Sequence, residues 1–229
     1  MKPILQAFKT YEIAPRGWMK KQLEIQAESL SGELYKVWRD VRDSKWIGGD
    51  AEGWERVPYW LDCFIPLAFL LRDEEKMAVA RKYVDAILDG QQEDGWICPC
   101  SFEARKNYDM WALILLSKVL VVWYSATEDE RVEPALRRAM KNFYDGLKDG
   151  SLNVAWWAKA RWFESFFALS WLYERGREDW IVELAQMLHD RGADYISFEE
   201  RWKVPLNKWT FETHVVNAEI GRASCRERV

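Results

Sequence analysis

The chain has few cysteines and no excess of basic charge, and each shortage excludes a class of protein. Four cysteines in 229 residues are too few for a secreted scaffold built on disulfides. Lysine and arginine number 33 against 37 aspartates and glutamates, which gives a net charge of −4. A nucleic-acid-binding protein shows a basic face, so nucleic acid is not expected as a partner. The low cysteine content favours a reducing, cytoplasmic location.

Long hydrophobic runs are also missing. The longest, residues 111–124, contains Lys118 and is too short to span a bilayer, so no membrane association is expected. The first six residues, MKPILQ, lack the apolar core of a signal peptide. With 49% hydrophobic and 31% charged residues, the composition is that of a globular protein rather than a disordered one. The length allows one large domain or two small ones, and nothing in the sequence indicates an oligomeric state.

Tryptophan, in contrast, is abundant, with 15 residues. A tryptophan side chain buries a large apolar surface and keeps one N–H donor. Such enrichment fits an aromatic core between helices. It fits equally a carbohydrate site, in which flat rings stack on the C–H faces of sugars. The composition leaves both interpretations open.

Hydrophobic periodicity predicts an all-α fold made of helical hairpins, in which nearly all-apolar helices alternate with amphipathic ones. The apolar segments lie at 57–71, 108–124 and 158–173, and the amphipathic ones at 22–41, 74–88, 127–147 and 178–189. Glycine-containing loops are expected at 46–54 and 91–100. Pro66 predicts a kink, and TEDE at 127–130 predicts a capping box that opens the next helix. No alternating strand pattern competes with this interpretation.

The hairpins repeat along the chain. Asp73, Asp129 and Asp179 stand at the junctions between an apolar and an amphipathic helix, at separations of 129 − 73 = 56 and 179 − 129 = 50 residues. A covered helix paired with a water-facing one predicts two layers, an inner and an outer one. An open α-solenoid and a closed α/α toroid both fit this pattern. The divergent repeats and their long loops rich in Trp, Gly and Asp favour an α/α toroid, incomplete in this chain.

The loops before the apolar helices bring aromatic and polar side chains to the helix N-termini. Free backbone N–H groups and the positive ends of helix dipoles gather there, which suits a polar ligand. Aromatic rings beside acids or amides offer the stacking and the hydroxyl hydrogen bonds that a sugar needs. The candidate substrate-binding residues are Trp54, Glu55, Tyr59, Trp60 and Asp62 at the first apolar helix, Asn107, Tyr108, Asp109 and Trp111 at the second, and Trp156, Trp157, Arg161, Trp162 and Glu164 at the third.

Several candidates also have a purely structural interpretation. Asp62 on a buried helix fits a paired core acid equally well. Arg161 and Glu164 are spaced i,i+3 and fit a simple ion pair. Cys98 and Cys100 form a CPC pair, but two thiols two positions apart make a poor chelate, so they are expected to be ordinary loop thiols rather than metal ligands.

Five strings carry a family resemblance. They are GWERVPYWLDCFIPLAFLL (53–71), ILDGQQEDGWICP (87–99), YDMWALILLSKVLVVWYSATEDERV (108–132), ARWFESFFALSWLYERGREDWIVELAQMLHDRGADY (160–195) and THVVNA (213–218). Together they resemble the β-L-arabinofuranosidase-like glycoside hydrolases, family 127 and its relatives. The last string resembles that family's HxVN-type segment, which precedes an inner helix. The resemblance covers most of residues 15–218.

The resemblance implies a catalytic α/α toroid followed by β-sandwich domains, in an enzyme that cleaves terminal β-L-arabinofuranosyl groups with retention. It implies a cysteine thiolate nucleophile in a zinc site of cysteines and a glutamate, with another glutamate as acid/base. Zinc lowers a thiol pKa, and the acid protonates the leaving oxygen. In that family these groups follow the HxVN segment. No catalytic residue, metal ligand or cofactor is therefore assigned to this chain.

The resemblance adds one residue to the candidates. His214 aligns with a histidine that the family places near the sugar, so it joins the substrate-binding set. Relatives also carry histidines at the earlier helix ends, and this chain has none there. A carbohydrate substrate is expected, and the identity of its sugar stays open.

Residues 219–229, EIGRASCRERV, are basic and lack apolar periodicity. They read like translated sequencing-adapter DNA, so the native partial toroid is expected in residues 1–218. We expect the chain to be part of a glycoside hydrolase, inactive and poorly soluble by itself, because an open edge exposes apolar helix faces. One alternative is a carbohydrate enzyme of the unsaturated glycuronyl hydrolase type, in which Asp50, Asp62 or Asp109 would act. Another is a noncatalytic helical-repeat module.

Overall fold

The computed structural model describes residues 8–195, 197, 201, 203–209, 214, 216–218 and 220. This part of the chain is all-helical and has no strand, which confirms the predicted fold class. Of the tail 219–229 only Ile220 is described, so the predicted origin of that tail lies outside the described residues. The α-helices are α1 (Gly17–Glu28), α2 (Leu30–Val37), α3 (Arg39–Arg42), α4 (Arg56–Leu71), α5 (Glu74–Asp89), α6 (Trp111–Thr127), α7 (Val132–Asp149), α8 (Trp156–Ala160), α9 (Ser165–Gly176) and α10 (Asp179–Arg191). Short 3-10 helices are η1 (Thr10–Glu12), η2 (Lys45–Ile47), η3 (Phe102–Asn107), η4 (Trp162–Glu164) and η5 (Leu206–Lys208).

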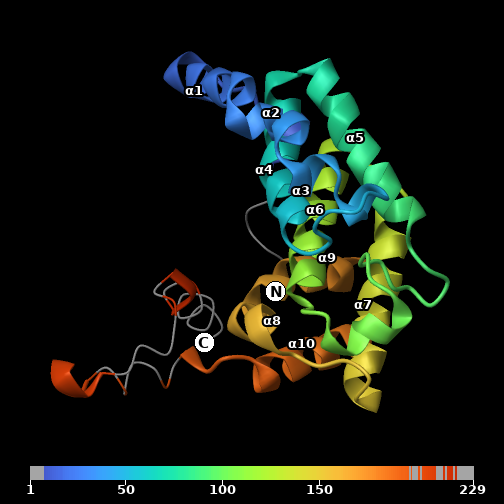
Figure 1. The fold of residues 1–229 in the computed structure, drawn as a ribbon, viewed down its shortest axis with the longest axis vertical. Coiled ribbons are helices and arrows are strands. Elements are labelled where there is room, and N and C mark those ends of the chain that lie inside the picture. The colour runs from blue at the N-terminus through green and yellow to red at the C-terminus, as the bar shows by residue number, and fades with distance from the viewer. Residues whose placement is uncertain are drawn as a thin grey trace.

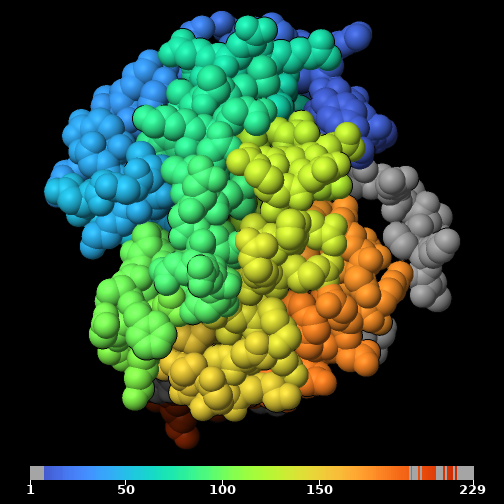
Figure 2. All heavy atoms as spheres, turned by 90° about the vertical axis from the view of Figure 1, so that its right-hand side faces the viewer, coloured from blue at the N-terminus to red at the C-terminus, as the bar shows by residue number. Residues whose placement is uncertain are grey.

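The helices form an inner row and an outer cover. In the inner row, α6 packs against α4 and against α9. The outer helices α5, α7 and α10 pack on α4, α6 and α9, respectively, and α10 also packs on α7. Figure 1 shows α4 and α6 near the centre, with α5 and α7 along one side. Figure 2, seen from that side, shows α5 in green, α7 in yellow and the orange segment that contains α10 covering this face.

The inner helix α6 is buried almost throughout, because its sequence is apolar on every side and it has neighbours on every side. Its indoles at Trp111 and Trp123 are among the largest fully buried side chains. The outer helix α7 buries only one face, with Leu136 and Phe143 fully buried, and turns its charged residues to water. At the edge of the inner row, α9 leaves Phe167 half exposed.

Three predicted elements keep their bounds to within a residue or two. These are α4, α5 and α10, predicted at 57–71, 74–88 and 178–189. Pro66 lies inside α4, and the helix continues through it to Leu71. Asp73 caps α5 by accepting a hydrogen bond from the Lys76 backbone N–H at 3.0 Å, as expected for an acid at that junction.

The single helix predicted at 22–41 is wrong. The chain instead forms α1, α2 and α3, with breaks at Ser29 and Trp38, which both have extended backbone. At the first break Gly32 comes so close to Ala27 that a Cβ on it would lie 1.9 Å from the Ala27 carbonyl oxygen. This close approach needs a residue without a side chain. Leu30 and Val37 are exposed, so the apolar spacing did not mark one buried face.

The capping box predicted at Thr127–Glu130 is also wrong. α6 continues to Thr127, whose hydroxyl donates back to the Trp123 carbonyl within the same helix. Glu128 then takes a left-handed conformation that ends α6. Asp129 accepts the Arg131 backbone N–H at 3.1 Å instead, immediately before α7 begins at Val132.

The apolar helix predicted at 158–173 is wrong in its continuity. The structure divides it into α8, η4 and α9, with Arg161 outside the helical region of backbone angles. The second inner helix also begins at Trp111 rather than Tyr108. No helix of the described residues is long and apolar enough to cross a membrane.

Candidate functional site

The N-terminal ends of α4, α6 and α9 meet at one end of the inner row. Five side chains near these ends, those of Glu55, Tyr59, Trp111, Arg161 and Glu164, contact one another through hydrogen bonds, an ion pair and ring contacts. The nearby ion pair of Asp62 and Lys118 acts electrostatically on Glu164. We call these seven residues the inner-end cluster. All but Lys118 are residues that the sequence predicted as substrate contacts.

Glu55 and Trp111 join the first two inner helices. The Trp111 indole Nε1 donates to Glu55 Oε2 at 3.0 Å, and the Arg56 guanidinium donates to Glu55 Oε1 at 3.0 Å. The ring of Tyr59 lies 5.9 Å from that of Trp111, centroid to centroid, in a tilted contact. Trp111 is only 1% exposed, so it contacts the other cluster residues from their buried side and offers no open ring face to a ligand.

Arg161 joins all three helix ends. Its Nη1 donates to Tyr59 Oη at 2.7 Å and lies 3.5 Å from Glu164 Oε1. Its guanidinium lies over the rings of Trp111 and Trp157, 5.0 and 5.7 Å from their centroids. Its Nε, withdrawn from solvent, has no hydrogen-bond partner in the described part of the chain.

Asp62 and Lys118 form the inner limit of the cluster. Lys118 Nζ lies 2.8 Å from Asp62 Oδ2, and the two side chains are 35% and 18% exposed. The core-acid interpretation of Asp62 is therefore correct as to its pairing. Lys118 was missed as a site residue, although a lysine within an apolar run needs a partner on the neighbouring helix, and that was the available signal.

The electrostatic state of the cluster follows from its partial burial. Burial raises the pKa of Glu164 above its usual value, with Asp62 adding to the shift and Arg161 and Lys118 opposing it. Burial likewise raises the pKa of Tyr59, against the lowering effect of Arg161. Tyr59 is therefore a neutral hydroxyl at physiological pH, able to donate as well as accept.

The free helix N-termini expected at this end are already occupied by acids of the chain. Glu52 accepts hydrogen bonds from the backbone N–H groups of Trp54, Glu55 and Arg56. Asp109 accepts those of Trp111, Trp157 and Ala158 at 3.0–3.1 Å, and so caps α6 and α8 together. Backbone donors and Asp109 are thus engaged in the fold, and side chains are left to contact a ligand.

Trp60 and Trp162, both predicted substrate contacts, lie in the hydrophobic core. Trp60 is 6% exposed, stacks on Phe64 at 4.3 Å and donates its Nε1 to the Ser31 carbonyl. Trp162 is 2% exposed and donates its Nε1 to the Ala193 carbonyl. These contacts make both indoles structural.

Four other predicted contacts also lie apart from the cluster's network. Tyr108 is partly buried and donates its hydroxyl to the Gly53 carbonyl at 2.6 Å. Trp54 is partly buried, and its Nε1 has no partner among the described residues. Asn107 is exposed at the end of η3. His214 is exposed, and its backbone carbonyl accepts a hydrogen bond from the Ala218 N–H.

Trp156 and Trp157 form the outer edge of the cluster. Trp156 is 78% exposed and has a φ of +49°, a left-handed conformation that costs a non-glycine residue about 1–2 kcal/mol. Trp157 is 41% exposed and contacts Arg161 through its ring. Exposed indoles on a strained turn are the stacking faces nearest to the polar groups of the cluster.

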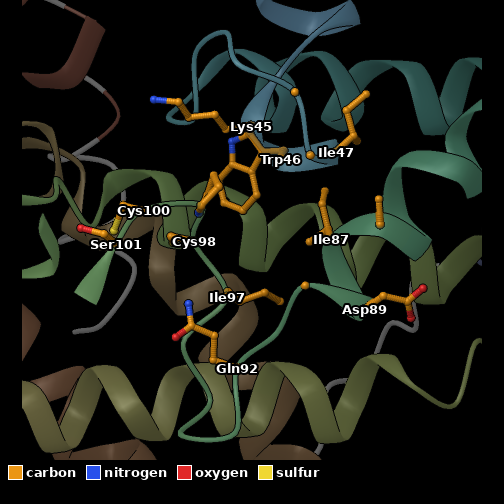
Figure 3. A pocket seen from close by; sticks show the side chains of 15 residues that line it. Lys45, Trp46, Ile47, Ile87, Asp89, Gln92, Ile97, Cys98, Cys100 and Ser101 are labelled. Atoms are coloured by element: carbon orange, nitrogen blue, oxygen red, sulfur yellow. The ribbon is translucent and has the colours of Figure 1, made fainter. Parts of the chain in front are cut away.

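Another hollow lies elsewhere, between η2, the end of α5 and residues 97–101. It has a volume of about 700 Å³. Figure 3 shows Trp46, Ile87, Ile97 and Cys98 around its apolar part, with Lys45 extending away. None of its lining residues belongs to the inner-end cluster.

The cysteines on the wall of this hollow do not suit a zinc site. Cys98 is fully buried, and burial raises the pKa of its thiol far above its usual value; burial also raises the pKa of Cys100. Two thiols two positions apart make a poor chelate by themselves. The described residues contain no group of three or more His, Cys, Asp or Glu that could hold a metal ion. No step of a reaction is derived through zinc for this part of the chain.

Comparison of the chain with protein-family models, with curated proteins and with solved structures finds no match.

Proposed function

We propose that the chain is part of a glycoside hydrolase and that its inner-end cluster contacts a terminal sugar, of the β-L-arabinofuranoside type. The two layers of inner and outer helices support this proposal, because an α/α toroid is built from such layers and its inner-helix N-termini surround the substrate. The proposal joins the family resemblance of the sequence to one observation. Polar side chains of α4, of α6 and of the segment before α9 gather at one end of the inner row.

The charges of the cluster suit a neutral sugar. Glu55 pairs with Arg56, Asp62 with Lys118, and Glu164 with Arg161. Because each charge has a partner, no unbalanced charge selects an ionic ligand. Carboxylate oxygens and guanidinium N–H groups keep unused positions, which accept from and donate to sugar hydroxyls. Trp156 and Trp157 add exposed ring faces for the C–H surface of the sugar.

Arg161 is the residue on which binding depends most. Its position between Tyr59, Glu164 and two indoles fixes the guanidinium plane in place. A fixed guanidinium presents paired donors to two neighbouring hydroxyls at little cost in side-chain entropy. Lysine keeps the charge and loses this geometry, so Arg161→Lys tests the geometry and not the charge.

The experiment is a titration of the chain with methyl β-L-arabinofuranoside, followed by the indole N–H resonances in ¹H–¹⁵N NMR spectra. The Trp111 indole, bonded to Glu55, reports on the cluster. Arg161→Lys should weaken binding by about 10- to 100-fold, the value of one or two hydrogen bonds to a charged group. Arg175→Lys is the matched control, since Arg175 stacks on Trp171 at 3.7 Å, away from the cluster.

The proposal fails if saturating sugar leaves the Trp111 resonance unmoved. It fails equally if Arg161→Lys and Arg175→Lys bind alike. Binding of the sugar that persists in Arg161→Lys would point to a site other than the inner-end cluster.

A further inference from the structure

A second hollow lies between the loop that follows α5 and the C-terminal end of α7. Its volume is about 530 Å³, and we call it the Arg105 hollow. The Asn142 side chain of α7 donates to the Asp94 carbonyl at 2.9 Å and so joins the two walls. In Figure 2 the light-green loop lies beside the lower part of yellow α7. None of its lining residues belongs to the inner-end cluster.

The floor of this hollow is a buried arginine held in place. The side chain of Arg105 is 10% exposed, and its guanidinium lies 4.7 Å from the ring centroid of Trp96 and 4.9 Å from that of Phe102. Its two terminal nitrogens donate to Asp94 and to Gln92. Its Nε, shielded from solvent, has no partner among the residues that the structure describes. Because that nitrogen is closed to solvent, the guanidinium is a fixed part of the wall of the hollow.

The rim offers acceptors for hydroxyl groups. Asp149 uses one carboxylate oxygen for the Ser151 backbone N–H at 2.8 Å and keeps the other free of that bond. Asp145 accepts from Lys141 through both carboxylate oxygens, at 2.6 and 2.7 Å, and each oxygen keeps a further lone pair. Phe102 is 73% exposed, so one of its sides is open to a ligand. An exposed aromatic ring stacks on the C–H face of a sugar, and carboxylates beside it accept hydrogen bonds from the hydroxyl groups of that sugar.

The charges of the hollow favour neither an anion nor a cation. Asp94, Glu103, Asp145 and Asp149 line it together with Arg105 and Lys106, so carboxylates are in excess and disfavour an anion. Asp94 already pairs with Arg105 and Asp145 with Lys141, which leaves little unbalanced negative charge to attract a cation. The ligand class that remains is neutral and rich in hydroxyl groups.

We propose that the Arg105 hollow is a second saccharide-binding site, which takes one neutral sugar unit. The unit stacks on Phe102 and donates its hydroxyls to Asp149 and Asp145. This inference does not depend on the inner-end cluster being the hydrolase site, since the two sets of residues are separate. The site would hold a longer glycan at a place other than the one where a terminal sugar is bound.

The test uses one neutral trisaccharide, arabinotriose, and one negatively charged trisaccharide, trigalacturonate. The indole resonances of Trp96 and Trp111 are separate reporters. Trp96 lies against Arg105 and reports on the hollow. Arabinotriose should shift the Trp96 resonance saturably, and trigalacturonate should leave it in place. Phe102→Ala should weaken the Trp96 response about 10-fold, and Asp149→Asn should weaken it less, because Asn keeps the oxygen that caps Ser151. Phe167→Ala, the loss of another exposed phenylalanine, is the control and should change nothing.

The outcomes separate this inference from the proposed function. A Trp111 response without a Trp96 response overturns the second site and leaves the first standing. A Trp96 response without a Trp111 response overturns the proposed function and leaves the second site standing. Equal binding of trigalacturonate, or an unchanged Trp96 response in Phe102→Ala, overturns the saccharide assignment of the hollow.

Discussion

Lys118 donates a hydrogen bond to Asp62 across 2.8 Å, and the two residues are 56 positions apart. The same separation joins Trp111 to Glu55. It is also the separation of Asp73 and Asp129 at successive junctions. Between the next pair of inner helices, Arg161 lies over Trp111 at 161 − 111 = 50, the separation of Asp129 and Asp179. Neighbouring inner helices therefore pack in register with the repeat, and equivalent positions meet at the inner-end cluster.

The Lys118–Asp62 pair should contribute to stability. Lys118→Met leaves a mostly buried carboxylate without its partner, and the free energy of unfolding should fall by about 1–2 kcal/mol, between the values of exposed and buried pairs. Asp62→Leu combined with Lys118→Met should regain most of that loss. Urea unfolding measures all three chains. Lys20→Met, in the more exposed pair with Glu24, should lower the free energy of unfolding much less than Lys118→Met does. Equal effects of the two lysine variants would contradict a special role for the inner pair.

Glu164 should make stability fall as pH rises. A carboxyl whose pKa is raised in the folded state binds more protons there, so its contribution is fully present below the usual value near 4.5 and is lost as pH rises through the folded pKa. Glu164→Gln should therefore gain stability relative to the parent chain between pH 4.5 and 7. Urea unfolding at several pH values measures this difference.

Asp129 provides a control of opposite sign. Its bond to Arg131 holds the pKa of its carboxyl well below the usual range. Its contribution is present above about pH 4 and is lost as pH falls. Asp129→Asn should thus lose stability at neutral pH and converge on the parent chain in acid. A flat difference for either variant would show that its carboxyl has the same pKa in the folded and unfolded chains.

Gly95 should tolerate no side chain. Its φ is +91°, and a Cβ would lie 2.5 Å from the Arg138 carbonyl oxygen on α7. Gly95→Ala should cost about 3 kcal/mol from conformation and overpacking together. Gly48→Ala is the matched control, with a φ of +83° and no atom within 4 Å of the added Cβ, and should cost about 1 kcal/mol. Thermal or urea unfolding compares them, and a smaller loss for Gly95→Ala than for Gly48→Ala would refute the close approach.

Cys98 should be unreactive in the folded chain. Full burial and a raised pKa keep its thiol neutral, while the thiolate is the reactive form. Iodoacetamide at pH 8, followed by peptide mass spectrometry, should label Cys63, which is exposed, well before Cys98. In urea the two should be labelled at similar rates. Rapid labelling of Cys98 in the folded chain would indicate a thiolate and reopen the question of a metal site there.

The chain alone should hydrolyse no aryl glycoside. Glu55 and Asp62 are engaged by Trp111 and Lys118, and Cys98 is a neutral thiol, so the described cluster presents binding groups without an activated nucleophile. A p-nitrophenyl glycoside assay over pH 4 to 8 measures this. Turnover that disappears in Glu164→Gln would contradict the prediction and make Glu164 a catalytic acid.

The sequence predicted the helices whose apolar pattern is continuous and whose ends carry local signals. Asp73 and Gly90 bound α5, and these signals act through neighbouring backbone groups. The breaks at Ser29 and Arg161 were not predictable, because they arise where a helix end must turn to pack on another helix. The wrong prediction of a capping box at Thr127 has a similar reason. α6 extends to Thr127, so this residue ends one helix and does not cap the next.

Six of the predicted contacts gather in the inner-end cluster, and Trp60 and Trp162 do not. On a helix that is apolar on all sides, sequence spacing cannot tell which indole faces the core and which faces the helix end. The Trp60 ring packs against Phe64 and Tyr83, and the Trp162 indole donates a hydrogen bond to the Ala193 carbonyl. Asp109 was placed at the correct end, but its oxygens bind the backbone of α6 and α8.

By itself the sequence determined the all-α class, the repeat of about 50–56 residues and the end of the inner helices at which polar and aromatic groups collect, because these follow from local periodicity and spacing. Only the tertiary structure decided which of those groups meet, that Lys118 belongs to the cluster and that Arg105 lines a second hollow. Such pairings join residues tens of positions apart, and they depend on how whole helices pack rather than on any local pattern.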